Sequence, residues 1–282
     1  MSATVWFNGA LVKEPLGIEA SERGLLLGDG IFETVAVFNR VGVWLEDHLD
    51  RLMAGAGALG LPADRDIVRE AAAEVLREAP AAHGVLRITL TRGPGVRGLA
   101  AEAARPSLLV TLGPWSGRML FAPAMLSTSS IRRNETSPAS RLKTLSYIDN
   151  IIAAREAASI HCDDALFLNH RGLVASTTIA NIFVLRDGWI ATPRAGDGVL
   201  AGIVRKKLLG LADAEERPVT PQELLDAEAV FLTNSLRLVR PVHSLDGRPL
   251  GRNDAALARF FDMLCRMIAE ETGLDPREVD AL

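Results

Sequence analysis

Short β-branched and aromatic runs alternate with segments of helical spacing along the first 112 residues, and this alternation is the strongest constraint on the fold. The strand-like runs cover residues 5–12, 32–38, 85–90 and 107–112. Apolar residues recur at helical spacing from Asp47 to Leu59 and from Asp64 to Arg77, each time after an acidic start. The pattern predicts an α+β domain over residues 1–112.

A segment rich in helix and strand breakers, Gly113 to Gly117, predicts a linker at 113–118 and a second domain over 119–282. The second part opens with the run 119–126. The pattern then predicts helices at 145–158, 203 to about 212 and 255 to about 271. It also predicts short strands near 165–168, 181–185 and 229–233.

Composition and charge exclude several classes of protein. The 282 residues are 48% hydrophobic, which excludes disordered and fibrous chains, and the net charge of -4 argues against nucleic acid as a partner. Two distant cysteines, Cys162 and Cys265, fit a reducing compartment. Because no apolar stretch has the length of a signal or a membrane span, we expect a soluble cytoplasmic protein with no membrane partner. The cysteines have no zinc-site spacing, and we expect no metal.

Lys143 is the residue most suggestive of chemistry, because it stands in SRLKTLSYIDN between a polar loop and an apolar helical pattern. Spacing alone favours a solvated lysine at a helix start. A lysine becomes a Schiff-base nucleophile only where a pocket lowers its pKa and a carbonyl partner is present. A phosphate seat is available in principle, because Gly202 to Arg205 open a predicted helix whose free amides suit an anion.

Eight segments, taken in order, resemble fold type IV enzymes that use pyridoxal 5'-phosphate (PLP), a group that includes branched-chain and D-amino-acid aminotransferases and 4-amino-4-deoxychorismate lyase. The resemblance runs from about residue 6 to residue 250. It implies a two-domain α+β fold with a smaller N-terminal α/β sandwich and a larger C-terminal domain with a barrel-like β core, bound PLP and a homodimer. The segments are SERGLLLGDGIFET, EDHLDRL, LRITLTRGPGVRG, SRLKTLSYIDN, DDALFLNHRGLV, ANIFV, GVLAGIVR and FLTNSLRLVRPV.

The resemblance also assigns roles to single residues. Lys143 matches the lysine that binds the cofactor covalently and moves protons, and Arg51 matches the phosphate-binding arginine. Tyr147 stands where a tyrosine is common near the cofactor, although it could equally be a core residue. The further phosphate contacts implied are the backbone amides of Ile203 and Val204 and the side chain of Ser235.

One departure from the family pattern matters for chemistry. The family carries a glutamate five residues before the asparagine of its N-I-F motif, where it protonates the pyridine nitrogen, but this chain has Ser176 there. No acidic residue occurs from Gly172 to Phe183. Without a carboxylate the ring is a weaker electron acceptor, which should harm transamination more than elimination.

Two motifs favour the lyase within the family. RGPGVRG at 92–98 and TNSLRLVRPV at 233–242 resemble the corresponding stretches of aminodeoxychorismate lyases. Their substrate carries two carboxylates, which suit guanidinium groups, so we expect substrate contacts among Arg92, Arg97, Arg237 and Arg240. Glu33 we expect to be structural.

The resulting expectation is a lyase that releases pyruvate and forms 4-aminobenzoate, a folate-pathway product, from a small-molecule carboxylate substrate. Two alternatives remain: an aminotransferase for D- or branched-chain amino acids, and a homologue that has lost catalysis or acquired a binding role.

Overall fold

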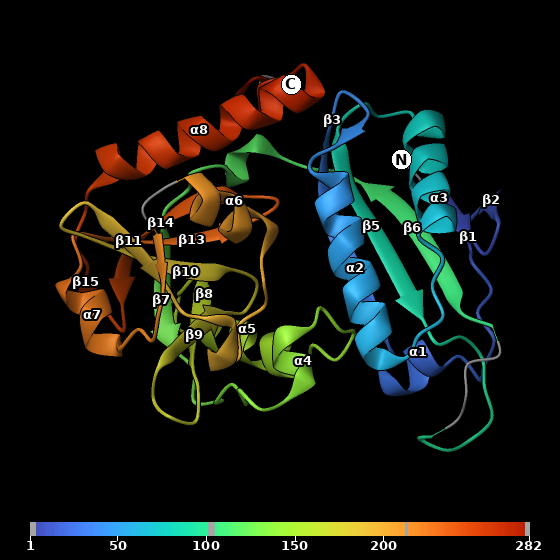
Figure 1. Cartoon of the computed structure of the whole chain (residues 1–282), viewed down its shortest axis with the longest axis horizontal. Helices are drawn as coiled ribbons and strands as arrows, with labels where there is room; N and C mark the ends of the chain where they lie inside the picture. Colours follow the sequence, from blue (N-terminus) through green and yellow to red (C-terminus); the bar gives the residue numbers. More distant parts are fainter. Residues whose placement is uncertain (1–3, 101–104, 212–213, 280–282) are drawn as a thin grey trace. The chain divides into compact units, whose positions relative to one another are not determined.

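The computed structural model describes residues 4–100, 105–211 and 214–279 (Figure 1). The chain forms two compact units: unit 1 contains Met1–Gly117, Leu142–Ser146 and Ile268–Leu282, and unit 2 contains Arg118–Arg141 and Tyr147–Met267. The domain limits predicted from the sequence, 1–112 and 119–282 with a linker at 113–118, stay a prediction. No helix in the described ranges is long and apolar enough to cross a bilayer.

Unit 1 is built on an antiparallel sheet in the order β2-β1-β6-β5-β3-β4. Two helices, α2 (Leu45–Leu59) and α3 (Arg65–Glu78), pack on one face of this sheet and on each other, and a short helix, α1 (Arg23–Leu27), precedes β3. The strands are β1 (Thr4–Phe7), β2 (Ala10–Val12), β3 (Gly30–Phe38), β4 (Val41–Gly42), β5 (Gly84–Thr91) and β6 (Ser107–Gly113).

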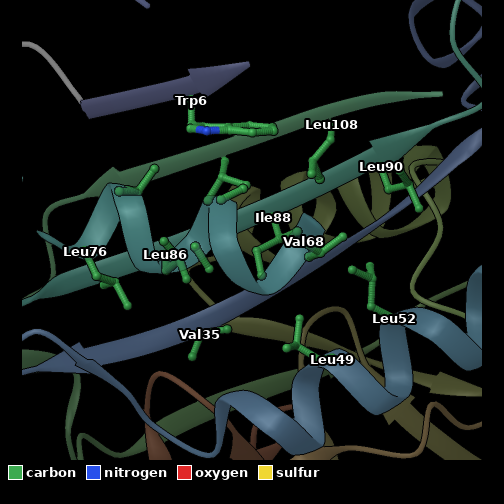
Figure 2. Packing of buried hydrophobic residues seen from close by; sticks show 14 of the residues in the cluster. Trp6, Val35, Leu49, Leu52, Val68, Leu76, Leu86, Ile88, Leu90 and Leu108 are labelled. Atoms are coloured by element: carbon green, nitrogen blue, oxygen red, sulfur yellow. The ribbon is translucent and has the colours of Figure 1, made fainter. Parts of the chain in front are cut away.

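Alternate residues of β3 and β5 fill the core of unit 1. Val35 on β3 and Leu86 and Ile88 on β5 are fully buried against Leu49 of α2 and Val68 of α3 (Figure 2). Burying a side chain of this size contributes roughly 1.5–3 kcal/mol. The apolar side chains that gave the strand and helix patterns therefore pack in one core, which holds β3 against α2.

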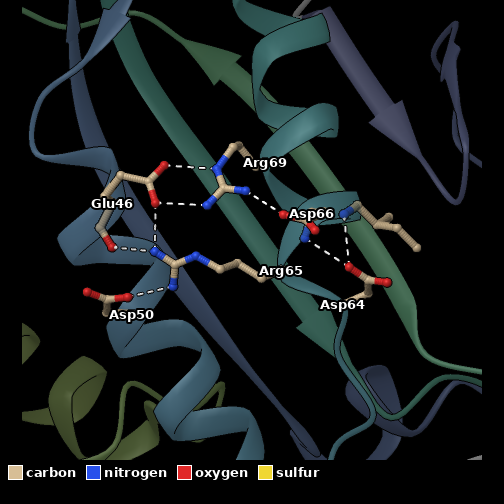
Figure 3. Close-up of polar contacts among 7 residues, drawn as sticks. Glu46, Asp50, Asp64, Arg65, Asp66 and Arg69 are labelled. Carbon is tan, nitrogen blue, oxygen red and sulfur yellow. Dashed lines mark hydrogen bonds and ion pairs between the residues drawn. The ribbon is translucent and has the colours of Figure 1, made fainter.

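An exposed polar cluster joins α2 and α3 on the surface. Glu46 of α2 accepts hydrogen bonds from Arg65 and Arg69 of α3, and Asp64 caps α3 by accepting from the amides of Asp66 and Ile67 (Figure 3). Because these charges face solvent, the pairs contribute little to stability.

Unit 2 contains a nine-stranded sheet in the order β12-β11-β10-β13-β14-β7-β8-β9, with β15 paired to β14. The end strand β9 also contacts β10, so the sheet curls into the barrel-like β core expected from the sequence. The strands are β7 (Ala124–Thr128), β8 (Asp164–Leu168), β9 (Val174–Thr177), β10 (Asn181–Arg186), β11 (Trp189–Thr192), β12 (Ala214–Glu216), β13 (Ala229–Asn234), β14 (Leu238–Leu245) and β15 (Arg248–Pro249).

Helices cover this curled sheet. Helix α5 packs on β8 and α6 on β12 and β13. The fully buried rings of Phe183 on β10 and Phe231 on β13 stack with their centroids 5.0 Å apart. The helices that begin in unit 2 are α4 (Pro138–Arg141), α5 (Ile148–Ser159), α6 (Ile203–Leu211), α7 (Pro221–Asp226) and α8 (Asp254–Thr272), and the last residues of α8 belong to unit 1.

Two predicted elements differ from the structure. The helix predicted from Leu145 begins at Ile148, because residues 142–146 are extended and Thr144 forms a bridge with Ile31 of β3. The run that opens the second part at Met119 forms a strand only from Ala124, after a short 3-10 turn at 117–119. The predicted end of the 203–212 helix lies outside the described residues.

Candidate active site

Lys143 lies on an extended segment that runs beside the start of β3 in unit 1. The amide of Phe32 donates to the carbonyl of Lys143, and the amide of Leu145 donates to the carbonyl of Gly30, both at 2.9 Å. The Nζ of Lys143 lies 4.4 Å from the centroid of the Phe32 ring. Backbone bonds on both sides of Lys143 thus hold the lysine in place.

The surroundings of Lys143 favour its neutral amine. Burial, followed by the positive charges of Arg51 and Arg87, lowers the pKa of Lys143 to about 8, although the negative charge of Glu33 opposes this shift. An amine with such a pKa is substantially neutral just above neutral pH, as a nucleophilic lysine must be. This environment distinguishes Lys143 from the solvated lysine that its spacing alone also allowed.

Glu33 and Arg51 form a two-point ion pair beside Lys143. Arg51 donates from Nε to Oε1 and from Nη2 to Oε2 of Glu33, each at 2.7 Å. Burial disfavours the charge of Glu33, but the hydrogen bonds and charge of Arg51 outweigh it and lower the pKa of Glu33 to about 2. Glu33 is therefore ionised, and it fixes the orientation of the arginine expected to hold phosphate.

His48 completes this cluster and was missed by sequence reasoning. Its Nδ1 lies 2.6 Å from Oε2 of Glu33, and its side chain is fully buried. Burial lowers the pKa of His48, so the ring is neutral and donates its Nδ1 proton to Glu33. The available signal was the acid in the middle of a buried strand and the histidine three residues before Arg51 on α2.

In unit 2, the loop before α6 forms a tight backbone cradle. Asn181 of β10 donates from Nδ2 to the carbonyl of Leu200 at 2.8 Å, and a Cβ on Gly202 would sit 2.0 Å from its Oδ1. Ile203 and Val204 are the first two residues of α6, where helix amides have no acceptor within the helix. Glycine is therefore required at 202, and the cradle suits an anion.

Ser235 stands in the turn between β13 and β14 of the same unit. Asn234 shapes this turn, because its Oδ1 accepts from the amides of Leu236 at 3.0 Å and Arg237 at 2.9 Å. Ser235 is half-buried.

Arg237 and Arg240 line a small pocket with Asp164 and Thr233. Arg240 donates to the carbonyls of Ala122 and Pro123 and pairs with Asp163, so it anchors the loop that leads into β7. Arg237 is half-buried, and burial together with the charge of Arg240 lowers its pKa. The two arginines line the same pocket, and the bonds of Arg240 to Ala122, Pro123 and Asp163 give it a structural role.

Arg92 and Arg97 belong to unit 1 and differ in environment. Arg92 donates to Asp29 at 2.8 Å and to the carbonyls of Leu59 and Gly60, so it ties β5 to the end of α2. Arg97 is exposed in the loop that follows.

Ser176 and Tyr147, both in unit 2, occupy defined positions. Ser176 is half-buried on β9 and pairs in register with Phe167 of β8. Tyr147 is half-buried at the N-cap of α5. The structure thus groups Lys143 with Arg51 in unit 1, whereas Tyr147, Ser176, Ile203, Val204, Ser235, Arg237 and Arg240 belong to unit 2.

The family model for amino-transferase class IV matches residues 30–245, most of the chain. The chain belongs to this family. Among its relatives are the branched-chain-amino-acid aminotransferase of Pseudomonas aeruginosa, 29% identical over 88% of this chain and 86% of that protein, and a bifunctional aminodeoxychorismate lyase and D-amino acid transaminase of Mycobacterium tuberculosis, 27% identical over 85% and 89%.

Solved structures agree with the class IV assignment. The fold IV transaminase CpuTA1 from Curtobacterium pusillum superposes with a TM-score of 0.82 at 29% identity, covering 93% of this chain and 98% of that one. The fold type IV architecture expected from the sequence is therefore confirmed.

PLP is the cofactor of the class IV family, and the PLP-bound form of a hypothetical aminotransferase from Mycobacterium tuberculosis has the same fold, with a TM-score of 0.83 at 24% identity over 95% of this chain and 99% of that one. The residues of this chain fit the cofactor. Lys143 is an amine whose pKa is lowered, and the α6 cradle would be filled by a Cβ at Gly202. Each feature, taken by itself, is chemically compatible with one part of the cofactor: a neutral amine with its aldehyde, and a helix start with its phosphate.

Proposed function

We propose that this class IV protein is a PLP-dependent lyase that eliminates pyruvate from 4-amino-4-deoxychorismate to give 4-aminobenzoate. The observation that supports the lyase over the aminotransferase is Ser176 on β9, at the position where the family carries a glutamate. A serine hydroxyl leaves the ring nitrogen largely unprotonated and the ring a weaker electron acceptor. Elimination tolerates this because expulsion of a leaving group discharges the carbanion.

Each residue has a task in this proposal. When bound, PLP supplies an aldehyde for the substrate amine and a ring that accepts electrons. Lys143 holds the cofactor at rest and then removes the ring proton of the substrate, which its pKa of about 8 allows near neutral pH. Arg51, the amides of Ile203 and Val204, and Ser235 bind the phosphate, and Tyr147 lies near the cofactor.

The arginines are proposed to bind the two carboxylates of the substrate. Arg97 and Arg237 are the first to test, because the structural bonds of Arg92 and Arg240 already direct their donors to Asp29, Asp163 and backbone carbonyls. Substitution of a carboxylate-binding arginine should raise KM far more than it lowers kcat.

A homodimer is also proposed. Helix α5 exposes Ile148, Ile151 and Ile152 at 63%, 44% and 40%, an apolar face that a second copy would cover. Light scattering of the purified protein should give twice the chain mass of 30.3 kDa, and a monomer at micromolar concentration would contradict this proposal.

The alternative is an aminotransferase for branched-chain or D-amino acids, which the names of the relatives favour. One experiment separates the two. Purified protein loaded with PLP is given aminodeoxychorismate without any keto acid, and pyruvate is measured with lactate dehydrogenase; in parallel, conversion of bound cofactor to its amine form by D- and L-amino acids is followed by absorbance. Pyruvate release supports the lyase, amine-form production without pyruvate supports the aminotransferase, and silence in both assays supports a homologue without turnover.

A further inference from the structure

Arg133 occupies a defined place beside β8 in unit 2. Its amide donates to the carbonyl of Leu168 at 2.9 Å, and its guanidinium carbon lies 4.1 Å from the centroid of the Phe167 ring. The stem is confined as well, because a Cβ on Gly198 would lie 3.1 Å from Cγ of Arg133. Backbone, ring and loop therefore hold this cation in position.

The charge of Arg133 has no matching acid in the described part of the chain. No carboxylate forms an ion pair with it there, and its one polar side-chain contact is with Oδ1 of Asn150 at 3.4 Å, at the limit of a hydrogen bond. Tyr147 and Asp149 at the start of α5 act on it only through longer-range electrostatics, and burial lowers its pKa. An arginine remains charged even so, so this half-buried cation stays without a matching carboxylate.

Ser176 faces the same side of the sheet as this cation. Phe167 and Ser176 are register partners in the β8–β9 pair, and side chains of such partners project from one face with Cβ atoms about 5 Å apart. Because the guanidinium lies over the Phe167 ring, Arg133 and Ser176 are both neighbours of Phe167. Phe167 thus links the position that lacks the family's glutamate to a cation that lacks a carboxylate.

We propose that Arg133 and Ser176 together form the wall of the site that receives the ring nitrogen of PLP, and that the fixed guanidinium charge keeps this nitrogen unprotonated. The inference rests on the PLP role of Ser176 in the proposed function. It reaches beyond it by naming the group that determines the protonation state. A nearby cation disfavours a second positive charge, and a guanidinium N–H can donate to the lone pair of an unprotonated nitrogen but not to a protonated one.

This arrangement deepens the preference for elimination. Ser176 alone would remove the acid that protonates the ring, leaving the nitrogen to respond to pH. Arg133 makes the weak electron acceptor a fixed property of the site across physiological pH. A substrate class with a built-in leaving group is then favoured over ordinary amino acids.

The protonation state can be read directly, without turnover. The protein is loaded with PLP labelled with ¹⁵N at the ring, and the ¹⁵N chemical shift is recorded from pH 6 to 9 without substrate. For wild type we expect the shift of an unprotonated nitrogen throughout. Arg133→Gln should raise the midpoint of nitrogen protonation by at least one pH unit, about tenfold in proton affinity.

Matched variants separate charge from structure. Arg133→Lys keeps the cation and should behave as wild type, and Arg132→Gln, at the exposed neighbouring position, should change nothing. Arg133→Met retains the apolar contact with Phe167 and replaces the glutamine variant if that protein does not fold. A protonated nitrogen in wild type, or an unchanged midpoint in the glutamine or methionine variant, would overturn the proposal. Failure of wild type to retain any PLP through desalting would instead contradict the proposed function.

Discussion

Arg51 donates two parallel hydrogen bonds to Glu33, each 2.7 Å long, and Glu33 is almost fully buried. The arginine proposed to bind phosphate is therefore oriented before any anion arrives. Two-point arginine–carboxylate pairs are among the strongest and most directional ion pairs in proteins. Glu33, expected from the sequence to be structural, is in this sense a positioning residue for the phosphate.

Glu33→Gln should lower both stability and PLP affinity. Because the pKa of Glu33 falls from an ordinary value near 4.5 to about 2 in the fold, its ionised form contributes stability above about pH 4.5, and this contribution is lost as the pH falls towards 2. The shift corresponds to about 3 kcal/mol at neutral pH. Urea unfolding measures the first effect and PLP titration of the apoprotein the second.

Glu46→Gln is the matched control, because Glu46 also accepts hydrogen bonds from two arginines but lies on the surface. It should cost no more than about 1 kcal/mol and leave PLP affinity unchanged. Equal destabilisation by the two variants would contradict the role assigned to the buried pair.

Lys143→Ala should abolish turnover and the absorbance of cofactor-bound protein near ~410–430 nm that a Schiff base gives, while the chain stays folded by circular dichroism. Lys13→Ala, on the exposed edge of unit 1, is the control and should retain both. A borohydride-reducible bond to PLP in the Lys143 variant would show that another lysine is the nucleophile.

The reaction of apoprotein with PLP should depend on pH with a midpoint near 8. The neutral amine is the nucleophile, so the rate should rise about tenfold per pH unit below the Lys143 pKa of about 8 and level off above it. An ordinary lysine would keep accelerating to about pH 10.4. Stopped-flow absorbance measures the rate, with Nα-acetyl-lysine as the reference amine. A rate that continues to rise beyond pH 9 would contradict the claim that burial lowers the pKa of Lys143.

Gly202→Ala should weaken PLP binding at least tenfold, because its Cβ would meet Oδ1 of Asn181 at 2.0 Å and displace the turn before α6. Gly210→Ala is the control, because Gly210 lies within α6 and a Cβ added there would have no atom within 4 Å. There alanine should stabilise the protein by up to about 1 kcal/mol, since glycine is a poor helix former. The dissociation constants of PLP from the two variants are compared. Equal constants would mean that the cradle before α6 does not hold the phosphate.

The sequence predicted the main strands and helices well, because each places apolar residues at one clear period. Strand β14 was missed because Arg240 and Pro241 interrupt it, and Pro241 is tolerated since pairing with β7 begins only at Val242. The start of α5 was predicted three residues early, because the pairing of Thr144 with Ile31 overrides local helical spacing.

The site was harder to predict from sequence than the fold. The roles of Lys143 and Arg51 came from family resemblance, whereas the contacts that tune them come from β3 and α2 and depend on tertiary packing. Arg133 gave no signal at all, because its relation to Ser176 arises only through the β8–β9 register and the Phe167 ring.

Ser176→Glu should shift the balance of reactions towards transamination. A carboxylate on this face of β9 would meet the positive charge of Arg133 and could protonate the ring nitrogen, which strengthens the ring as an electron acceptor. We expect conversion of bound PLP to its amine form by D- or L-amino acids to accelerate tenfold or more, equivalent to at least about 1.4 kcal/mol of barrier. Insertion of a longer side chain at this half-buried position disturbs the packing around it. Ser176→Gln is therefore the control, because glutamine has the size of glutamate without its charge. Both rates, pyruvate from aminodeoxychorismate and amine-form production, are measured on all three proteins. Equal rates for the glutamate and glutamine variants would show that charge at position 176 does not control the chemistry.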